Sequence, residues 1–131
     1  MIGYIVSLIC AIITFEMALL QLSITFGAPF GEYVLGGANK VLPKKMRLIS
    51  CTFFLIFIFV GMAYLQWGNI LYIGFNSMFV KIIIIVNTLF LAYAIIGNGV
   101  VTKSKKEKYV MTPFSIIQFI CSVVAFFSTY R

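Results

Sequence analysis

Residues 48–66 read LISCTFFLIFIFVGMAYLQ and carry no charge. An α-helix needs about 20 mostly apolar residues to cross the hydrocarbon core of a bilayer, so this stretch predicts a membrane span. Stretches of similar length and character occupy 2–26, 79–97 and 109–128. We therefore expect an all-α integral membrane protein: one domain over residues 1–131, built as a bundle of four transmembrane helices.

The composition of the whole chain agrees with this expectation. Of the 131 residues, 63% are hydrophobic and 10% are charged, and the mean hydropathy is +1.11. An average soluble domain has about a quarter charged residues, so this chain cannot cover a water-facing surface. These values exclude an ordinary soluble domain and a disordered chain. They also argue against a nucleic-acid partner, in spite of the net charge of +7.

Several kinds of chemistry are excluded by missing residue types. The chain has no histidine and no aspartate, and its acids are Glu16, Glu32 and Glu107. Histidine-ligated haem, zinc sites with histidine and Ser-His-Asp catalysis are therefore ruled out. The three cysteines lack C-x-x-C spacing and lie in apolar runs, where a free thiol packs as a small hydrophobe. We expect no enzyme activity, no metal site and no cofactor.

The basic residues predict one orientation in the membrane. Eight of the ten lie in the two segments 27–47 and 98–108, which two spans separate and which therefore share a face. The positive-inside rule places both segments in the cytoplasm and both termini outside. We expect the plasma membrane of a bacterium, because the Ile, Phe and Lys richness suits such a source.

The same segments form a candidate site for anionic phospholipid headgroups. Glycine backbone N–H groups beside lysine and arginine can hold a phosphate. The candidate residues are Gly36, Gly37, Lys40, Lys44, Lys45, Arg47, Lys103, Lys105 and Lys106. The alternative is a topology anchor with glycine turns and no bound ligand.

Small and weakly polar residues recur at helical spacing in the spans, which is typical of faces where membrane helices meet. In the last span they are Ser115, Gln118, Ser122 and Ala125; in the third, Asn87, Ala94 and Asn98; in the second, Ser50 and Gly61; and in the first, Ser7, Thr14, Gln21 and Thr25. We expect these stripes to face the interior of the bundle.

Glu16 points away from the stripe of the first span. A carboxylate on a lipid-facing surface costs about 2.5 kcal/mol or more, so we expect a second copy or another membrane partner to cover it. Glu16, Asn87 and Gln118 lie at similar depth, and the two amides are candidates to hydrogen-bond a neutral Glu16. Such a group could exchange protons; the alternative is a silent structural carboxyl.

The loop residues also resemble an uncharacterised family of small bacterial four-span membrane proteins. The resemblance rests on Gly27-Ala28-Pro29-Phe30-Gly31, where the family usually has Trp at the fourth position, and continues at Gly36-Gly37, Leu42-Pro43, Arg47, Asn98, Ser104, Lys105, Lys106, Glu107 and Pro113. It implies four spans and draws attention to the two basic loops, without implying an activity.

Three classes of function remain. The first is a non-enzymatic membrane component that binds lipid or a partner. The alternative is a small proton-linked transporter or channel that uses Glu16. An enzyme acting on lipid has the least support, since Glu32 is its sole candidate loop acid.

Overall fold

The computed structural model describes residues 1–33, 40–101 and 105–129. Its long helices are α1 (Ile2–Thr25), α2 (Lys44–Trp67), α3 (Ser77–Ile96) and α4 (Thr112–Thr129). Short helical turns lie between them: η1 (Gly31–Tyr33), η3 (Gly97–Val101) and η4 (Glu107–Met111). Within these described ranges there is no strand, and four helices are long and apolar enough to cross a membrane. The prediction of an all-α four-span bundle is confirmed.

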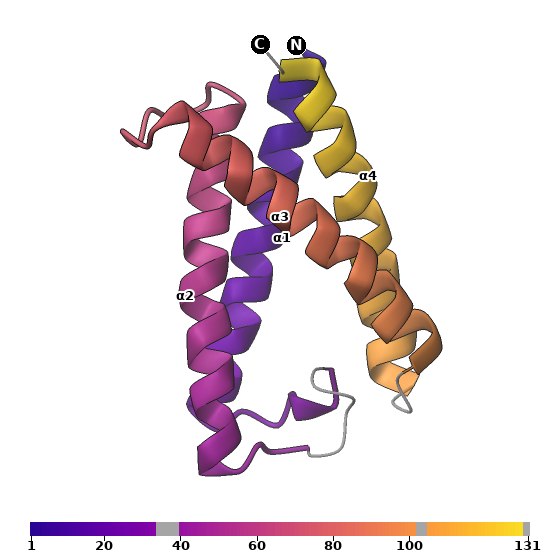
Figure 1. The fold of residues 1–131 in the computed structure, drawn as a ribbon. Helices are drawn as coiled ribbons and strands as arrows, with labels where there is room; N and C mark the ends of the chain where they lie inside the picture. Colours follow the sequence, from indigo (N-terminus) through magenta and orange to yellow (C-terminus); the bar gives the residue numbers. More distant parts are fainter. Residues whose placement is uncertain (34–39, 102–104, 130–131) are drawn as a thin grey trace.

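The four long helices form a closed ring of neighbours. The main contacts join α1 to α2, α2 to α3, α3 to α4 and α4 back to α1. Figure 1 shows both termini and the α2–α3 turn at one end of the bundle, which we call the terminal end. The helix ends that the two lysine-rich segments join lie at the opposite end, which we call the basic end.

Three helix starts differ from the predicted boundaries, and that of α4 is at Thr112, three residues late, after the helical turn η4. Helix α2 begins four residues early, directly after Pro43, so Lys44 and Arg47 belong to its first turn rather than to a loop. Proline suits the start of a helix because its φ is already close to the helical value. Helix α3 begins two residues early because the Asn76 side chain accepts a 2.8 Å hydrogen bond from the Met78 backbone N–H.

The hydrophobic core lies in the terminal half of the bundle. Its buried members are Cys10, Ala11, Val60, Ala63, Tyr64, Val80 and Ile84. Gly61 in α2 and Gly68, the residue that caps its C-terminus, allow α1 to approach closely, as small residues do between membrane helices. A Cβ added at Gly61 would lie 2.6 Å from the Phe15 ring, and one added at Gly68 would lie 2.5 Å from the Ser7 Cβ.

Hydrogen bonds tie the helices of this half together. The buried Tyr64 hydroxyl lies 2.6 Å from the Ser122 hydroxyl and accepts a 2.8 Å hydrogen bond from the Asn87 amide. The Ser122 hydroxyl is also 2.6 Å from that of Thr88. Because these residues come from α2, α3 and α4, a single network links three helices within the hydrophobic core.

The terminal end is closed by two side chains of α2. The Gln66 amide pairs with the Phe75 backbone in both directions, at 2.7 and 2.9 Å, and so closes the α2–α3 turn. The Trp67 indole N–H donates to the Ala125 carbonyl at 2.9 Å, and its ring stacks on Phe126. The terminal half is therefore bonded as well as packed.

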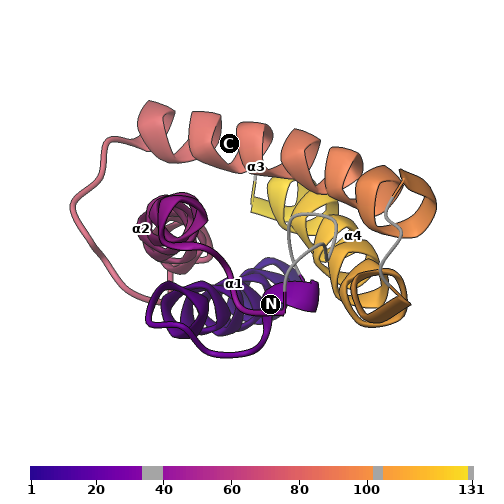
Figure 2. The same ribbon diagram turned by 90° about the horizontal axis from the view of Figure 1, so that it is seen from below.

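The basic half is arranged differently. Figure 2, a view from the basic end, shows α1 beside α2 and α3 beside α4, with η1 lying beneath the bundle. Between α2 and α3 stand large rings, Phe53 against Phe90, with centroids 6.2 Å apart. Since side-chain size sets the distance between packed helices, these rings keep α2 and α3 further apart than small residues at the same positions would.

Candidate functional site

The basic half of the bundle contains a partly open cavity of about 570 Å³. All four long helices contribute to it, together with the helical turns η1, η3 and η4. Pockets that hold small molecules measure about 300–1,000 Å³, so the volume suits a small ligand. The cavity lies between the α1–α2 pair and the α3–α4 pair.

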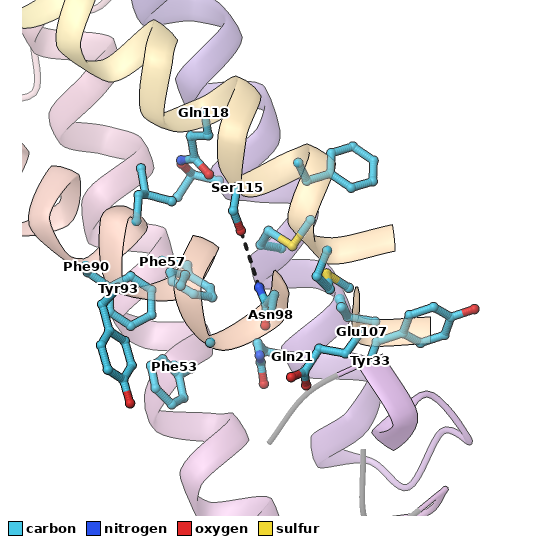
Figure 3. Close-up of a pocket in the computed structure, with 18 of the residues that line it drawn as sticks. Gln21, Tyr33, Phe53, Phe57, Phe90, Tyr93, Asn98, Glu107, Ser115 and Gln118 are labelled. Carbon is cyan, nitrogen blue, oxygen red and sulfur yellow. Dashed lines mark hydrogen bonds between the residues drawn. The ribbon is translucent and has the colours of Figure 1, made fainter. Parts of the chain in front are cut away.

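The two walls of the cavity differ in chemistry, as Figure 3 shows. One wall is aromatic and comes from α2 and α3: Phe53, Phe57, Phe90 and Tyr93. The facing side comes from α1, η3, η4 and α4 and carries the amide and hydroxyl groups of Thr14, Gln21, Asn98, Ser115 and Gln118 together with apolar side chains such as Met17, Leu20 and Phe114. An apolar or aromatic body can pack on the first wall while its polar group bonds to the second.

Most residues of the inward stripes predicted from the sequence are buried, whereas Thr25, Ala94 and Asn98 are half-buried. Ser7, Thr14, Gln21, Ser50, Asn87, Ser115, Gln118, Ser122 and Ala125 are all buried. In the terminal half these residues pack between helices, and Ser122 also hydrogen-bonds to Tyr64, while the Ser7 hydroxyl has no partner among the described residues. In the basic half the same stripes supply polar groups to the facing side of the cavity, because the helices there stand too far apart to close on them.

Asn87 and Gln118, two of the predicted site residues, both line the cavity. Their amides are held by neighbours: the Asn87 amide donates to Tyr64, and the Gln118 amide donates to the Thr14 hydroxyl at 2.6 Å. Asn87 is therefore the residue at which the cavity meets the hydrogen-bond network of the terminal half.

Glu16 lies elsewhere. Its side chain is exposed on the outer face of α1 and does not line the cavity. The expectation that Asn87 and Gln118 hydrogen-bond Glu16 is wrong, because both amides bond inside the bundle on the side opposite Glu16. The physical reason is the helical spacing of α1: Thr14 and Glu16 are two residues apart and so face nearly opposite directions.

Glu107 is the site residue that sequence reasoning missed. Its side chain is 5% exposed and lies at the basic end of the cavity, near Gln21 and Asn98 in Figure 3. It belongs to η4, a π-helical turn directly before α4. The signal was present: the stripe of the last span continues backwards at helical spacing to Met111 and Glu107, both buried.

The Ser50 hydroxyl is also buried in the cavity wall. It is 1% exposed, and its oxygen has no hydrogen-bond partner among the described residues. Several helical hydroxyls bond to the carbonyl four residues earlier, as Thr14 does to Cys10 at 2.7 Å and Thr52 does to Leu48 at 2.9 Å. The Ser50 hydroxyl shares its lack of a partner among the described residues with those of Ser7 and Thr112, and all three oxygens are almost inaccessible.

The candidate headgroup residues are spread over the basic end. Lys40, Lys44, Lys45, Lys105 and Lys106 are exposed, while Gly36, Gly37 and Lys103 lie outside the described residues. Arg47 braces the fold: its Nε donates to the Leu42 carbonyl at 2.9 Å, and its guanidinium packs on the turn at Gly27, which has φ +95°. The described residues hold no group of His, Cys, Asp or Glu side chains that could bind a metal.

Comparison with known proteins gives this site no name. No family model, no curated protein and no solved structure matches the chain. The chemistry of the cavity therefore rests on its own residues.

Proposed function

We propose that this chain is a non-enzymatic membrane protein that binds a small amphipathic molecule, such as a lipid, in the cavity of its basic half. The observation that carries the proposal is the pairing of an aromatic wall with amide and hydroxyl groups on the facing side of about 570 Å³. Ligand sites are mostly apolar with a few polar groups that fix orientation, which describes this cavity. Binding is preferred over a transport cycle through Glu16 because Glu16 does not line the cavity.

A pair of matched variants tests the proposal. Ala94 lines the cavity, and Ala92 lies on the same helix outside it. Ala94→Phe fills the cavity without changing charge, whereas Ala92→Phe adds the same ring elsewhere. The probe is monolaurin, an uncharged single-chain glyceride, and the readout is native mass spectrometry of protein released from nanodiscs.

We expect monolaurin to bind the unaltered chain and Ala92→Phe equally, and to bind Ala94→Phe at least tenfold more weakly. Equal binding by both variants would place the glyceride on the outer surface and would refute the cavity as a binding site. Absence of binding by the unaltered chain would refute it as well.

The second part of the proposal concerns orientation. The exposed lysines of the basic end support a cytoplasmic position beside anionic lipid, where each basic residue contributes about 1 kcal/mol of attraction. Lys44→Ala with Lys45→Ala should reduce retention of phosphatidylglycerol over phosphatidylcholine in native mass spectrometry. Lys44→Arg with Lys45→Arg keeps the charge and should retain it; equal retention by both double variants would contradict this part.

The third part concerns a second copy of the chain. The outer face of α1 carries exposed side chains at alternating spacings of four and three residues, Ile5, Ile9, Ile12, Glu16 and Leu19. This is the spacing at which two helices pack side by side, and it would take Glu16 out of the lipid.

Single-molecule photobleaching in liposomes tests the copy number. We expect pairs for the unaltered chain and mostly single copies for Glu16→Lys, because two lysines would then face each other. Leu55→Lys, on the exposed face of α2, is the control and should leave pairs intact. Single copies of the unaltered chain would rule out this pairing.

A further inference from the structure

We infer that the cavity recognises free hydroxyl groups on its ligand, so that it takes a hydroxylated lipid, such as a glyceride with unsubstituted hydroxyls. This inference rests on the proposed binding function and adds to it the chemistry of the ligand's head. Two observations carry it: the direction in which two buried amides of the cavity are turned, and a third buried amide, that of Gln21, which has no partner among the described residues.

The orientation of the Gln118 amide is fixed by a hydroxyl of α1. The Thr14 hydroxyl donates its proton to the Cys10 carbonyl at 2.7 Å. A hydroxyl has one proton and two lone pairs, so Thr14 can only accept from a further neighbour. The 2.6 Å contact between Thr14 and Gln118 is therefore a donation from the Gln118 nitrogen.

A chain of hydroxyls fixes the Asn87 amide in the same way. The Thr88 hydroxyl donates to the Ile84 carbonyl at 2.7 Å, so it accepts from the Ser122 hydroxyl. The Ser122 proton is thus directed to Thr88, and Ser122 accepts from the Tyr64 hydroxyl. Tyr64 has only lone pairs left for Asn87, so the 2.8 Å contact is a donation from the Asn87 nitrogen.

The oxygens of these two amides are left for a ligand. The nitrogen and the oxygen of a carboxamide point in different directions, so a contact that holds the nitrogen turns the oxygen away from the same hydroxyl. Asn87 and Gln118 are buried residues that line the cavity. Neither oxygen accepts a hydrogen bond from the described residues, and neither is as fully enclosed as the Ser50 oxygen. These two residues therefore present hydrogen-bond acceptors to the cavity.

Gln21 adds an amide whose donors and acceptor are all unused within the described part of the chain. Its side chain is 9% exposed, lines the cavity and lies close to Asn98 in Figure 3. Its backbone carbonyl accepts a hydrogen bond from Thr25, but its side-chain amide bonds to no described residue. A buried amide without a partner is costly, and a ligand that supplies a partner recovers that cost.

A ligand hydroxyl suits these amides better than an ether or ester oxygen does. A hydroxyl both donates and accepts, so it can donate to the oxygen of Asn87 or Gln118 and can bond to either end of the Gln21 amide. An ether or ester oxygen only accepts, and it would meet the two amide oxygens with no hydrogen between them. With the aromatic wall packing the chain of the lipid, the facing side selects a head with free hydroxyls.

The experiment compares three esters of the same acyl chain. Monolaurin has two free hydroxyls, 2,3-dimethoxypropyl laurate has both of them methylated, and propyl laurate lacks them. Each is titrated as a mole fraction of the nanodisc lipid, and native mass spectrometry counts the bound copies. Binding to Ala94→Phe, whose cavity is filled, is subtracted as binding to the outer surface. We expect monolaurin to bind in the cavity at least tenfold more tightly than either of the other two esters.

Variants then locate the groups that select. Gln21→Met keeps the length of the side chain and removes its amide, and it should lower the preference for monolaurin over propyl laurate to threefold or less. Ser23→Ala removes a polar group of α1 outside the cavity and should keep the full preference. Equal binding of the three esters to the unaltered chain, or an unchanged preference in Gln21→Met, would overturn the inference.

The two proposals fail in different ways. If all three esters bind equally to the unaltered chain and are excluded by Ala94→Phe, the binding function stands and hydroxyl recognition is refuted. If monolaurin binds the unaltered chain no better than Ala94→Phe, both are refuted. Should Gln21→Met not fold, the comparison of the three esters on the unaltered chain still decides.

Discussion

The terminal half and the basic half of this bundle use the same four helices in opposite ways. In the terminal half, glycine and alanine bring the helices together, and Tyr64 and Trp67 bond across them. In the basic half, rings such as Phe53 and Phe90 hold the helices apart around a cavity. Polar stripe residues contact neighbouring helices in the terminal half, whereas in the basic half residues of the same stripes line the cavity.

The difference shows how a small membrane protein can separate stability from binding. Lipid does not drive helices together as water does, so packing and hydrogen bonds must hold the bundle. Because the close packing and the interhelical hydrogen bonds are concentrated in the terminal half, the basic half can contain a cavity. Binding regions are generally drawn from the less stable parts of a fold, which is the expectation for the proposed binding cavity.

The largest expected effect comes from adding volume to each half. Ala63 is fully buried in the core, so Ala63→Leu should lower the free energy of unfolding by about 3 kcal/mol through overpacking. Ala94→Leu adds the same atoms in the cavity and should change the free energy of unfolding by less than about 0.5 kcal/mol. Unfolding in mixed detergent micelles measures both, and equal losses would mean that the halves are packed alike.

Close helix approach gives the next effect. Gly68→Ala would bring a Cβ within 2.5 Å of the Ser7 Cβ, which no rotamer change relieves. We expect a loss of about 2 kcal/mol in the free energy of unfolding. The control is Gly97→Ala, whose Cβ meets nothing within 4 Å and which should be neutral or slightly stabilising. A neutral Gly68→Ala would show that α1 and α2 are free to separate.

Removing the central hydroxyl of the network gives a smaller effect. Tyr64→Phe deprives Asn87 and Ser122 of a partner and should cost about 1 kcal/mol, as interhelical hydrogen bonds in membranes do. Tyr72 is 85% exposed, so Tyr72→Phe should cost less than about 0.3 kcal/mol. The same unfolding assay measures both variants, and equal losses would mean that the hydrogen-bond network around Tyr64 does not stabilise the fold.

Two buried serines give the smallest and sharpest contrast. Ser122→Ala removes a bonded hydroxyl and should cost about 1 kcal/mol. Ser50→Ala removes a hydroxyl that has no partner in the described part of the chain. The free energy of unfolding of this variant should therefore lie within about 0.5 kcal/mol of that of the unaltered chain, or above it. A loss in Ser50→Ala equal to that in Ser122→Ala would mean that the Ser50 hydroxyl stabilises the fold as much as a bonded one does.

Most of the fold could be predicted because its causes are local. Span length follows from apolar runs, and the inward faces follow from helical spacing, so Ser122 and Gln118 were placed correctly. Extending the stripe of the last span by two steps would have reached Glu107. The lysines beside Glu107 give residues 98–108 the composition of a solvated loop, which hides this continuation of the stripe.

The partners of the polar residues could not be predicted in the same way. Depth in the membrane brought Glu16, Asn87 and Gln118 to one level, but depth does not give the direction in which a helix faces its neighbours. The structure pairs Asn87 with Tyr64 and Gln118 with Thr14 and leaves Glu16 outside. Three-dimensional arrangement of α1, α2 and α4 decides these pairs.

The amino-acid sequence alone therefore specifies four apolar helices, their inward stripes and a strong asymmetry of basic charge, because each depends on residues close together in the chain. The cavity and its inward carboxylate depend on how far apart the helices stand, which side-chain sizes on different helices set jointly. Gly61 against Phe15 closes one half and Phe53 against Phe90 opens the other, and neither pairing is visible until the helices are assembled.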